Sequence, residues 1–272
     1  MNVITSSRNP AVTAARKLAR GRGRARAHSG RFLLEGAQML ETAMAAGARP
    51  LAVFVTAHAS VDDRHQALLA AARERGAEIR VVAAPLLADL APTVSPQGLV
   101  AVVGSVVGTL RDLPATPRLV CVLVEIRDPG NAGTVLRAAD AFGADALVTT
   151  AGSVDLENPK AVRASAGSLF HLPVVGGADW PALAAALRER GLALVGADPH
   201  APASIERVPL ERPCALVLGN EAHGLPERVR ADLDHLARLP QYGRAESLNL
   251  AAAAAVLLYE CARRQREAAG GR

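Results

Sequence analysis

The sequence predicts an α/β protein whose larger domain is built on a mostly parallel sheet. The chain has 272 residues, of which 50% are hydrophobic and 21% charged, so it can form a packed core in one large or two small domains. After residue 118, short apolar runs alternate with amphipathic segments, which is typical of strands and helices that cover both faces of a parallel sheet. Polar clusters that contain glycine follow three of these runs, where ligands bind in such sheets.

Residues 32–105 are predicted to form a smaller α/β domain. The segment 36–46 carries apolar residues at helical spacing and ends before Gly47. The segment 62–75 begins with two aspartates and ends with arginines, which suits the dipole of a helix. Strands are expected at 51–55, 79–82 and 99–103, with a turn at 95–98.

Residues 106–117 lack apolar periodicity and contain Gly108, Pro114 and Pro117, so we interpret them as a linker. The second domain is predicted over 118–265, followed by a tail at 266–272. Its expected strands are 119–126, 146–150, 170–175, 192–196, 215–218 and 237–239. Its expected helices are 131–142, 158–166, 181–190, 226–233 and 247–264.

The positive charge is concentrated at the N-terminus. The formal net charge is +5, and residues 1–34 carry eight bases and no acid. We expect residues 1–31 to be a basic arm, mobile over 21–27, that binds RNA phosphates, although a solubilising tail is the alternative. The candidate RNA-binding residues are Arg16, Lys17, Arg20, Arg22, Arg24 and Arg26 in the arm, and Lys160 and Arg163 on the helix predicted at 158–166, where a solvated face is the alternative.

Several classes of protein are disfavoured by what the sequence lacks. It contains no G-x-G-x-x-G, no G-x-x-x-x-G-K-[ST], no H-E-x-x-H and no G-x-S-x-G. The histidines show no metal-ligand spacing, and the three cysteines are far apart, so we expect neither a metal site nor a disulfide framework. The longest apolar run, 250–259, is too short to span a bilayer, and we see no secretory signal. A cytoplasmic location without a membrane partner is the expectation.

The first polar cluster, at 128–133, leads into a helix that contains Arg137. Asn131 could act there as a helix N-cap or as a functional amide. An arginine within an apolar helix is costly unless it is paired or faces a ligand, so Arg137 either pairs with Asp140 or serves a site.

The second and third clusters lie at 216–226 and 239–249. In the second, Gly219 permits close approach of a ligand, and Glu221 either holds a polar site together or caps the next helix. In the third, Ser247 suits an N-cap, whereas Asn249 in the first turn of a buried helix is harder to explain structurally. The alanines at 251–255 indicate a close backbone crossing or a subunit interface.

Taken together, the three clusters resemble the motifs of the SpoU/TrmH family of RNA ribose 2′-O-methyltransferases, within the SPOUT superfamily. N-x-G-x-x-x-R at 131–137, L-G-N-E-x-x-G-L at 218–225 and E-S-L-N at 246–249 are similar to its three motifs, and 158–167 is also family-like. Residues 32–36 and 95–98 resemble, more loosely, the L30e-like substrate-binding domain of many members. Gln241 departs from the family, where methionine often follows the proline.

The resemblance implies a deep trefoil knot in the C-terminal domain, a homodimer packed through the knot, and S-adenosylmethionine as cofactor. By position, the implied cofactor-binding residues are Thr150, Leu218, Gly219, Asn220, Leu239 and Leu248. The implied catalytic residues are Asn131, Arg137, Glu221, Ser247 and Asn249. Arg137 corresponds to the base proposed in the family, but arginine stays protonated, so we expect it to bind the substrate phosphate or the developing oxyanion.

The expected activity is methyl transfer to a ribose 2′-hydroxyl in RNA, with ribosomal RNA preferred because a separate N-terminal domain is present. A tRNA ribose methyltransferase is the alternative of the same fold. A non-catalytic RNA-binding or ribosome-assembly factor on the same scaffold is the alternative of a different class, and a small-molecule O-methyltransferase fits the basic arm less well.

Overall fold

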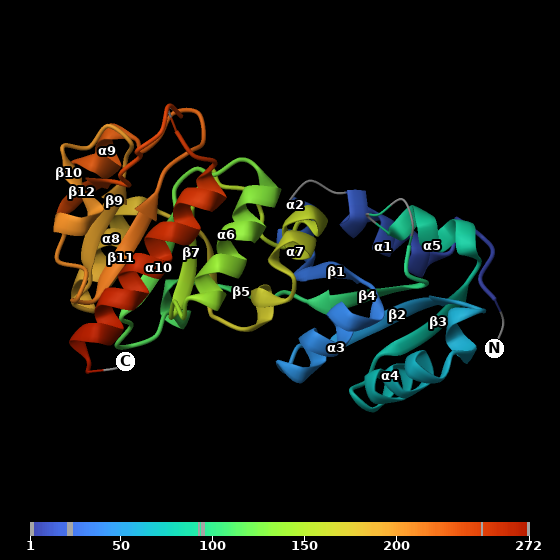
Figure 1. The fold of residues 1–272 in the computed structure, drawn as a ribbon. Helices are drawn as coiled ribbons and strands as arrows, with labels where there is room; N and C mark the ends of the chain where they lie inside the picture. The colour runs from blue at the N-terminus through green and yellow to red at the C-terminus, as the bar shows by residue number, and fades with distance from the viewer. Residues whose placement is uncertain (1–2, 21–23, 92, 94–95, 246, 271–272) are drawn as a thin grey trace. The chain divides into compact units, whose positions relative to one another are not determined.

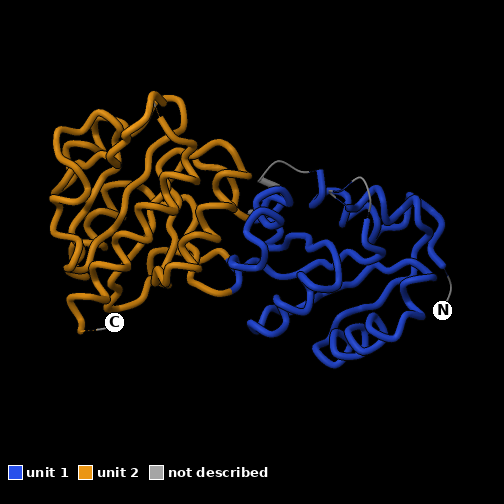
Figure 2. The backbone as a smooth tube through the Cα atoms, viewed as in Figure 1, with its two compact units in different colours: residues 1–106, 157–170 blue, residues 107–156, 171–272 orange. Residues whose placement is uncertain are grey.

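The computed structural model describes residues 3–20, 24–91, 93, 96–245 and 247–270. The chain forms two compact units, shown in blue and orange in Figure 2. Unit 1 comprises Met1–Val106 and Glu157–Phe170, and unit 2 comprises Val107–Leu156 and His171–Arg272.

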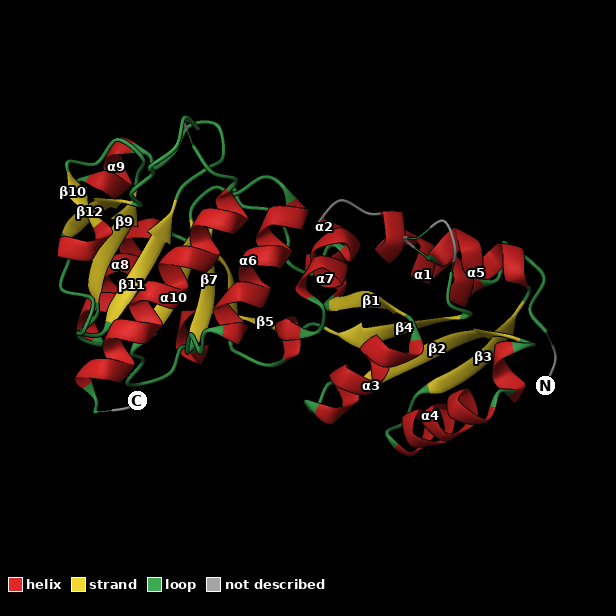
Figure 3. Ribbon diagram, in the orientation of Figure 1, coloured by secondary structure: helices red, strands yellow, loops and turns green. Residues whose placement is uncertain are grey.

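Unit 1 is built on a mixed sheet of order β1-β4-β2-β3 (Figure 3). β4 pairs antiparallel with β1 and β2, whereas β2 and β3 are parallel. The strands are β1 (Arg31–Glu35), β2 (Pro50–Thr56), β3 (Glu78–Val82) and β4 (Leu99–Gly104), and the helices after β1, β2 and β3 are α3 (Ala37–Ala45), α4 (Asp63–Glu74) and α5 (Ala84–Leu90). The predicted segments are found with small shifts of their ends, while β1 and α5 were not predicted.

The prediction of a mobile stretch at 21–27 was wrong for residues 24–27, which are helical, whereas residues 21–23 lie outside the described residues. Residues 10–20 and 24–29 form helices α1 (Pro10–Arg20) and α2 (Arg24–Ser29). Val12, Ala15 and Leu18 recur every third residue, and this stripe is buried in the core of unit 1. Burying such a stripe stabilises a helix even in a strongly basic segment.

Several arm arginines are consequently occupied by intramolecular contacts. Arg16 and Arg20 form ion pairs with Asp89 at 3.1 and 3.3 Å. Arg26 is only 2% exposed, and its guanidinium donates to the carbonyl of Leu18, so it offers no surface to a phosphate. Lys17 is exposed, whereas Arg22 and the side chain of Arg24 lie outside the described residues.

Residues 157–170 pack within unit 1, although the sequence analysis included them in the second domain. Helix α7 (Pro159–Ser165) buries Ala161 and Val162, and the ring of Phe170 stacks on Phe32 with centroids 6.2 Å apart. The apolar face of this short helix is covered by a partner distant in sequence, which local periodicity cannot identify. The strand predicted at 170–175 starts only at Val174.

The linker predicted at 106–117 is shorter in the structure. Val107–Gly108 forms β5, which pairs in parallel with Val174 and Val175, and a 3-10 turn at Leu110–Asp112 follows behind a capping box at Thr109. A two-residue edge strand is too short to give a periodic signal in the sequence.

Among the described residues, unit 2 contains an eight-stranded sheet of order β10-β12-β9-β11-β6-β7-β8-β5 (Figure 1). Every pair in it is parallel. The remaining strands are β6 (Leu119–Leu123), β7 (Ala146–Thr150), β8 (Val174–Ala178), β9 (Ala193–Ala197), β10 (Ala203–Ser204), β11 (Cys214–Leu218) and β12 (His235–Arg238). The helices are α6 (Pro129–Ala141), α8 (Trp180–Glu189), α9 (Glu227–Arg230) and α10 (Leu250–Ala268), with α10 lying against α6. This parallel sheet confirms the predicted fold class and places the carboxyl ends of its strands at one edge.

The three cysteines are free and buried in unit 2. Burial raises the pKa of the Cys121 thiol to about 12, and a contact with Cys214 together with burial raises the pKa of Cys261. These thiols stay neutral near neutral pH, so we assign them to the core rather than to chemistry. The helices that the structure describes include none long and apolar enough for a bilayer, and the described His, Cys, Asp and Glu residues form no group of three suited to a metal ion.

Candidate functional site

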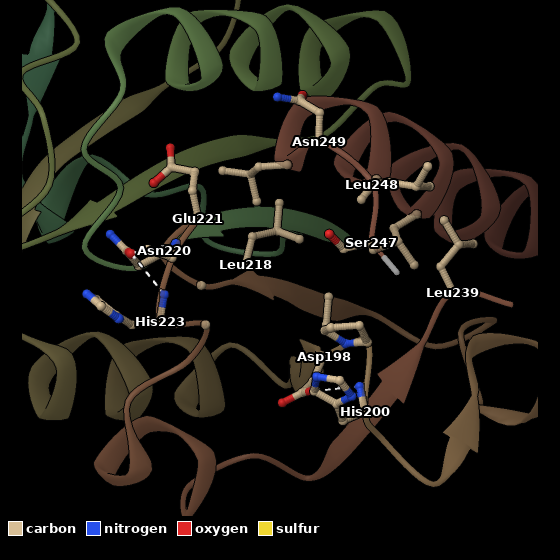
Figure 4. A pocket seen from close by; sticks show the side chains of 18 of the residues that line it. Asp198, His200, Leu218, Asn220, Glu221, His223, Leu239, Ser247, Leu248 and Asn249 are labelled. Atoms are coloured by element: carbon tan, nitrogen blue, oxygen red, sulfur yellow. Dashed lines mark hydrogen bonds between the residues drawn. The ribbon is translucent and has the colours of Figure 1, made fainter. Parts of the chain in front are cut away.

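A cavity of about 710 Å³ opens at the carboxyl edge of the parallel sheet of unit 2 (Figure 4). Its walls come from the segments that follow β9, β11 and β12 and from the first turns of α6 and α10. The apolar part is formed by Leu218, Leu239, Leu248, Ala253 and Leu257, and the polar part includes Asn131, Asp198, His200, Asn220, Glu221, Arg230, Ser247 and Asn249. Residues from the three predicted clusters therefore line one cavity.

A directed chain of hydrogen bonds joins the three clusters. The Asn249 side chain accepts from the amides of Ala251 and Ala252, at 2.9 and 3.4 Å, and its Nδ2 donates to Asn131 Oδ1 at 3.2 Å. Asn131 Nδ2 in turn donates to Glu221 Oε1 at 3.2 Å. Both amides are fixed in orientation, because the free amides at the start of α10 require an acceptor and the ionised carboxylate accepts only.

Helix capping explains why these side chains are available. Asp128 caps α6 by accepting from the amide of Asn131 at 2.7 Å, so the side chain of Asn131 is not used as a cap. Asn249 caps α10, which begins at Leu250, and Ser247 lies before the helix and lines the cavity instead. Glu221 caps no helix, since α9 starts behind Pro226. The structure thus decides among the alternatives that the sequence left open.

A tight hairpin at 220–224 forms the floor between β11 and α9. Asn220 and Gly224 exchange two backbone hydrogen bonds of 2.9 Å, and Asn220 Oδ1 accepts from the amides of Ala222 and His223. Gly219 lies against this hairpin so closely that a Cβ there would overlap the backbone of Gly224 and come 2.5 Å from the amide nitrogen of Leu225. Only glycine at 219 allows the hairpin to fold back onto the strand.

Glu125, which sequence reasoning missed, holds a left-handed backbone conformation with φ of 53° two residues after the end of β6. Its amide donates to Thr150 Oγ1 at 3.1 Å, its carbonyl accepts from Asn220 Nδ2 at 2.8 Å, and its carboxylate pairs with Arg228 at 2.5 Å. Surrounding contacts of this kind are what retain a strained conformation near a functional site.

Thr150 was assigned to the cofactor, and the structure does not support this. Thr150 is buried, does not line the cavity, and uses its hydroxyl to fix Glu125. Thr150 therefore acts on the site indirectly, by holding the backbone of Glu125. The other five residues assigned to the cofactor, Leu218, Gly219, Asn220, Leu239 and Leu248, all line the cavity.

A second hollow of about 650 Å³ shares the 220–224 hairpin with the first cavity. It also shares Asn131 and Glu221, and adds Glu125, Arg127, Asp128 and Pro226. The backbone amide of Arg127 donates to Glu221 Oε2 at 3.4 Å, while its side chain makes no hydrogen bond or ion pair with the described residues. The one signal for it in the sequence is an arginine immediately before the first polar cluster.

Arg137 lies apart from both cavities. It is on the exposed side of α6, and no described residue forms an ion pair or a hydrogen bond with its guanidinium. The alternative partner, Asp140, instead contacts His171 Nδ1 at 2.7 Å. The intramolecular ion pair considered for Arg137 is therefore absent from the described residues, and its charge is available to another molecule.

Comparison with known proteins assigns the family. Residues 118–259 match the SpoU rRNA methylase family, and residues 9–101 match the MRM3-like substrate binding domain. The chain belongs to the SpoU rRNA methylase family. The family match extends through residues 157–170, which pack in unit 1.

Two relatives in the SpoU family cover nearly the whole chain. The 23S rRNA (guanosine(2553)-2′-O)-methyltransferase RlmP of Bacillus subtilis is 31% identical over 259 residues, which is 95% of this chain and 98% of the relative. An uncharacterised tRNA/rRNA methyltransferase of Synechocystis is 36% identical over 262 residues, covering 96% and 94%.

Solved structures of SpoU-type enzymes have the same fold. AviRb from Streptomyces viridochromogenes, in complex with AdoMet, superposes with a TM-score of 0.88 at 30% identity and covers 97% of this chain and 100% of its own. An AdoMet-bound rRNA methyltransferase from Sinorhizobium meliloti gives a TM-score of 0.86 at 28% identity, with coverage of 96% and 97%.

The cavity fits S-adenosylmethionine, the cofactor of the SpoU family. Its volume lies in the range of cofactor sites, its leucines suit an adenine ring, and the Gly219 hairpin leaves backbone atoms uncovered at the wall. Asp198 is 8% exposed and is neutralised by Arg230, which also lines the cavity, so the carboxylate of Glu221 is the negative charge at the wall that suits a cationic ligand.

Substitution of Asn249 separates the hydrogen-bond chain from helix capping. Asn249→Asp keeps an acceptor for the helix amides but places a carboxylate oxygen against Asn131 Oδ1, where the wild type has an amide donor. We expect the free energy of unfolding of this variant to stay within about 0.5 kcal/mol of wild type and its rate of methyl transfer to fall at least about tenfold. Asn249→Ala should in addition lose about 1 kcal/mol of stability, because it removes the helix cap. Full activity of Asn249→Asp would show that the amide orientation is unimportant.

The close contact at Gly219 predicts a cofactor-binding defect. Gly219→Ala forces the 220–224 hairpin away from β11, so we expect S-adenosylmethionine affinity, measured by calorimetry, to fall at least about tenfold. Gly243→Ala is the matched control, because a Cβ at Gly243 meets no atom within 4 Å. Equal affinities of the two variants would show that the hairpin is not part of the cofactor site.

Proposed function

We propose that this protein transfers the methyl group of S-adenosylmethionine to a ribose 2′-hydroxyl of ribosomal RNA. The observation that carries the proposal is the chain Asn249–Asn131–Glu221, which joins three separated segments at the wall of a cofactor-sized cavity. Membership of the SpoU family and the rRNA-directed names of the relatives support rRNA over tRNA.

The residues of the chain have distinct roles in this reaction. When bound, S-adenosylmethionine supplies an electrophilic methyl group. Leu218, Leu239 and Leu248 would hold its adenosine part, with the backbone at Gly219 and Asn220 contributing hydrogen bonds. Asn131 keeps an unused hydrogen and lone pair, so its fixed amide can orient the ribose hydroxyl together with Ser247. Such placement contributes most where reacting groups must meet in line.

The second hollow is the side on which we place the RNA. It adjoins Asn131, and Arg127 is the arginine among its lining residues, beside the carboxylates of Glu125, Asp128 and Glu221. We propose that the Arg127 guanidinium binds a phosphate next to the target ribose, since arginine offers a planar, bidentate donor set for phosphate. Lys160, Arg163 and Lys17, all exposed, are proposed to extend the RNA contact.

We propose that the protein is a homodimer formed through the exposed face of α6 and α10. Val256 and Tyr259 are 46% and 52% exposed on α10, and the ring of Tyr259 packs edge-on against Phe142 at the end of α6, with centroids 5.7 Å apart. Exposed apolar side chains gathered in this way mark interaction sites. The same two helices begin at the cavity, so a second copy docked on this face would lie beside it.

This arrangement gives Arg137 a role that a single chain does not provide. Since Arg137 is exposed on α6 and lines neither hollow, we propose that it serves the site of the second copy. There its guanidinium would stabilise the developing 2′-oxyanion or bind the adjacent phosphate, and the hydroxyl proton would leave through it or to water. A symmetric pairing would place two such arginines at two sites.

Two further properties belong to this proposal. We propose that the segment from β12 to α10 threads the trefoil knot characteristic of the fold. We also propose that the protein acts in the cytoplasm, which the free cysteines support.

Mapping of 2′-O-methyl groups tests the activity. Total RNA from cells with and without the gene should differ at a ribosomal RNA nucleotide, and the purified protein should restore that methyl group with S-adenosylmethionine. Failure to bind S-adenosylmethionine would instead support a non-catalytic assembly factor, and a methyl group restored only on tRNA would support the tRNA enzyme.

Arg137→Lys keeps the positive charge of the side chain but loses its planar fork. We expect a fall in kcat of at least about tenfold with unchanged S-adenosylmethionine affinity, because a bidentate contact is lost at the reacting oxygen. Single-turnover methyl transfer measures this effect. Near-wild-type turnover would contradict both a base and a bidentate clamp at this position.

The dimer is tested by introducing a charge on the apolar face. Val256→Glu should convert the dimer to a monomer in sedimentation analysis and abolish methyl transfer, because it would bury a carboxylate at the contact. Val61→Glu is the control, since Val61 is an exposed valine in unit 1, 66% exposed against 46% for Val256. An active wild-type monomer would contradict the proposal.

A further inference from the structure

Tyr242 is an aromatic residue that the fold of unit 2 leaves uncovered. The chain contains four phenylalanines, two tyrosines and one tryptophan. The phenylalanines, Trp180 and Tyr259 are each buried or packed against another ring. Tyr242 is 91% exposed and makes no ring contact or hydrogen bond with the described residues. Single exposed aromatic residues are common on protein surfaces, so the place of this one in the fold decides whether it has a role.

The loop that carries Tyr242 leaves the cofactor cavity and returns to it. Gln241 and Ser247 both line the cavity, and the Cα atom of Tyr242 follows that of Gln241 by about 3.8 Å. The loop joins β12 to α10 beyond the carboxyl edge of the sheet, and residues 241–245 are all exposed (Figure 1). Tyr242 itself is not among the residues that line the cavity. Its ring therefore faces solvent at the rim, beside the place proposed for the target ribose.

Arg244 adds to this loop a positive charge that the fold does not use. Its guanidinium is exposed and forms no hydrogen bond or ion pair with the described residues, whereas Arg238, before the loop, donates to two backbone carbonyls. A Cβ at the intervening Gly243 would meet no atom within 4 Å, so the space beside both side chains is open. The described residues 239–245 include no acid. A free ring and a free guanidinium two residues apart match the base and the phosphate of a nucleotide.

We propose that Tyr242 stacks on an unpaired base of the RNA substrate while Arg244 binds an adjacent phosphate. The enzyme then takes its target nucleotide from a single-stranded loop or bulge, because a base stacked within a helix offers no free face to a tyrosine ring. The inference rests on the proposed function, since it specifies the class of RNA that is held beside the methyl-transfer site.

Two other occupants of this surface explain less of it. The adenine ring of S-adenosylmethionine is expected among the leucines of the cavity, and Tyr242 does not belong to that lining. A second copy of the chain is expected on the exposed face of α6 and α10, whereas the loop at 241–245 precedes α10. Neither occupant accounts for the unused charge of Arg244, which suits a polyanion.

RNA binding to the full-length protein tests the stacking contact. The probe is a short fluorescein-labelled single-stranded RNA, followed by fluorescence anisotropy with S-adenosylhomocysteine at saturation, and the comparison is the same RNA annealed to its complement. Tyr242→Ala should weaken binding of the single strand at least about fivefold and change duplex binding by less than about twofold. Tyr242→Trp should keep the affinity, whereas Tyr242→Leu should lose it, because leucine is apolar but has no planar face.

The salt dependence of the same binding separates the two side chains. Arg244→Gln should reduce the slope of log K against log salt by about 0.7, the value for one phosphate contact on a single strand. Tyr242→Ala should leave the slope unchanged, since stacking releases no counterions. Arg207→Gln is the matched control, because Arg207 is an exposed arginine of unit 2 that lines neither hollow of that unit.

Methyl transfer and assembly decide among the occupants. With ribosomal RNA that lacks the methyl group, Tyr242→Ala should raise the KM for RNA while the S-adenosylmethionine affinity and the sedimentation coefficient stay as in the wild type. A loss of cofactor affinity, or a change of oligomeric state, would assign the ring to the cofactor or to a second copy and overturn the inference.

Equal binding by Tyr242→Ala and the wild type, or an equal loss on duplex RNA, would also overturn the inference. If the wild type methylates ribosomal RNA in that case, the proposed function stands. A wild type that binds single strands through Tyr242 but methylates no ribosomal RNA would instead contradict the proposed function.

Discussion

The free amides at the start of α10 are the constraint on which the candidate site depends. A helix terminus needs acceptors, and Asn249 provides one with its side-chain oxygen. The nitrogen of the same side chain must then face Asn131, and the nitrogen of Asn131 must face Glu221. The need to cap α10 thus sets the orientation of the Asn249 and Asn131 amides, and the chain of hydrogen bonds ends at the carboxylate of Glu221. This explains how two neutral amides and one carboxylate from three distant segments can hold a fixed arrangement without an ion pair between them.

The opposite wall of the site depends on backbone shape. Gly219 allows the hairpin at 220–224 to return against β11, and Asn220 ties that hairpin to the carbonyl of Glu125. Glu125 keeps its left-handed conformation because Thr150, Asn220 and Arg228 each hold a different part of it. The roles of Thr150 and Glu125 are therefore those of supports. A rigid wall of this kind suits a reaction in which alignment matters more than acid–base strength.

Unit 1 contributes a different kind of surface. Its N-terminal helices use an apolar stripe to pack a basic segment onto the core, which occupies Arg16, Arg20 and Arg26 and leaves fewer cations for RNA than the charge count suggests. Helix α7 joins the same unit, although the segments on either side of it belong to unit 2. Its arrival completes a cavity of about 340 Å³ within unit 1.

The sequence by itself determined the α/β class, most of the strands and helices, and the three polar clusters, because strand and helix periods, caps and glycine positions are local properties. It also determined the family, since the motifs at 131–137, 218–225 and 246–249 are contiguous in the chain. Only the tertiary structure decided that Asn249 rather than Ser247 caps α10, that Thr150 supports the site from behind, that Arg137 lies outside both hollows of unit 2, and that residues 157–170 pack with unit 1. Each of these outcomes depends on a contact between residues far apart in sequence, and no local pattern states which of several suitable partners a side chain will meet.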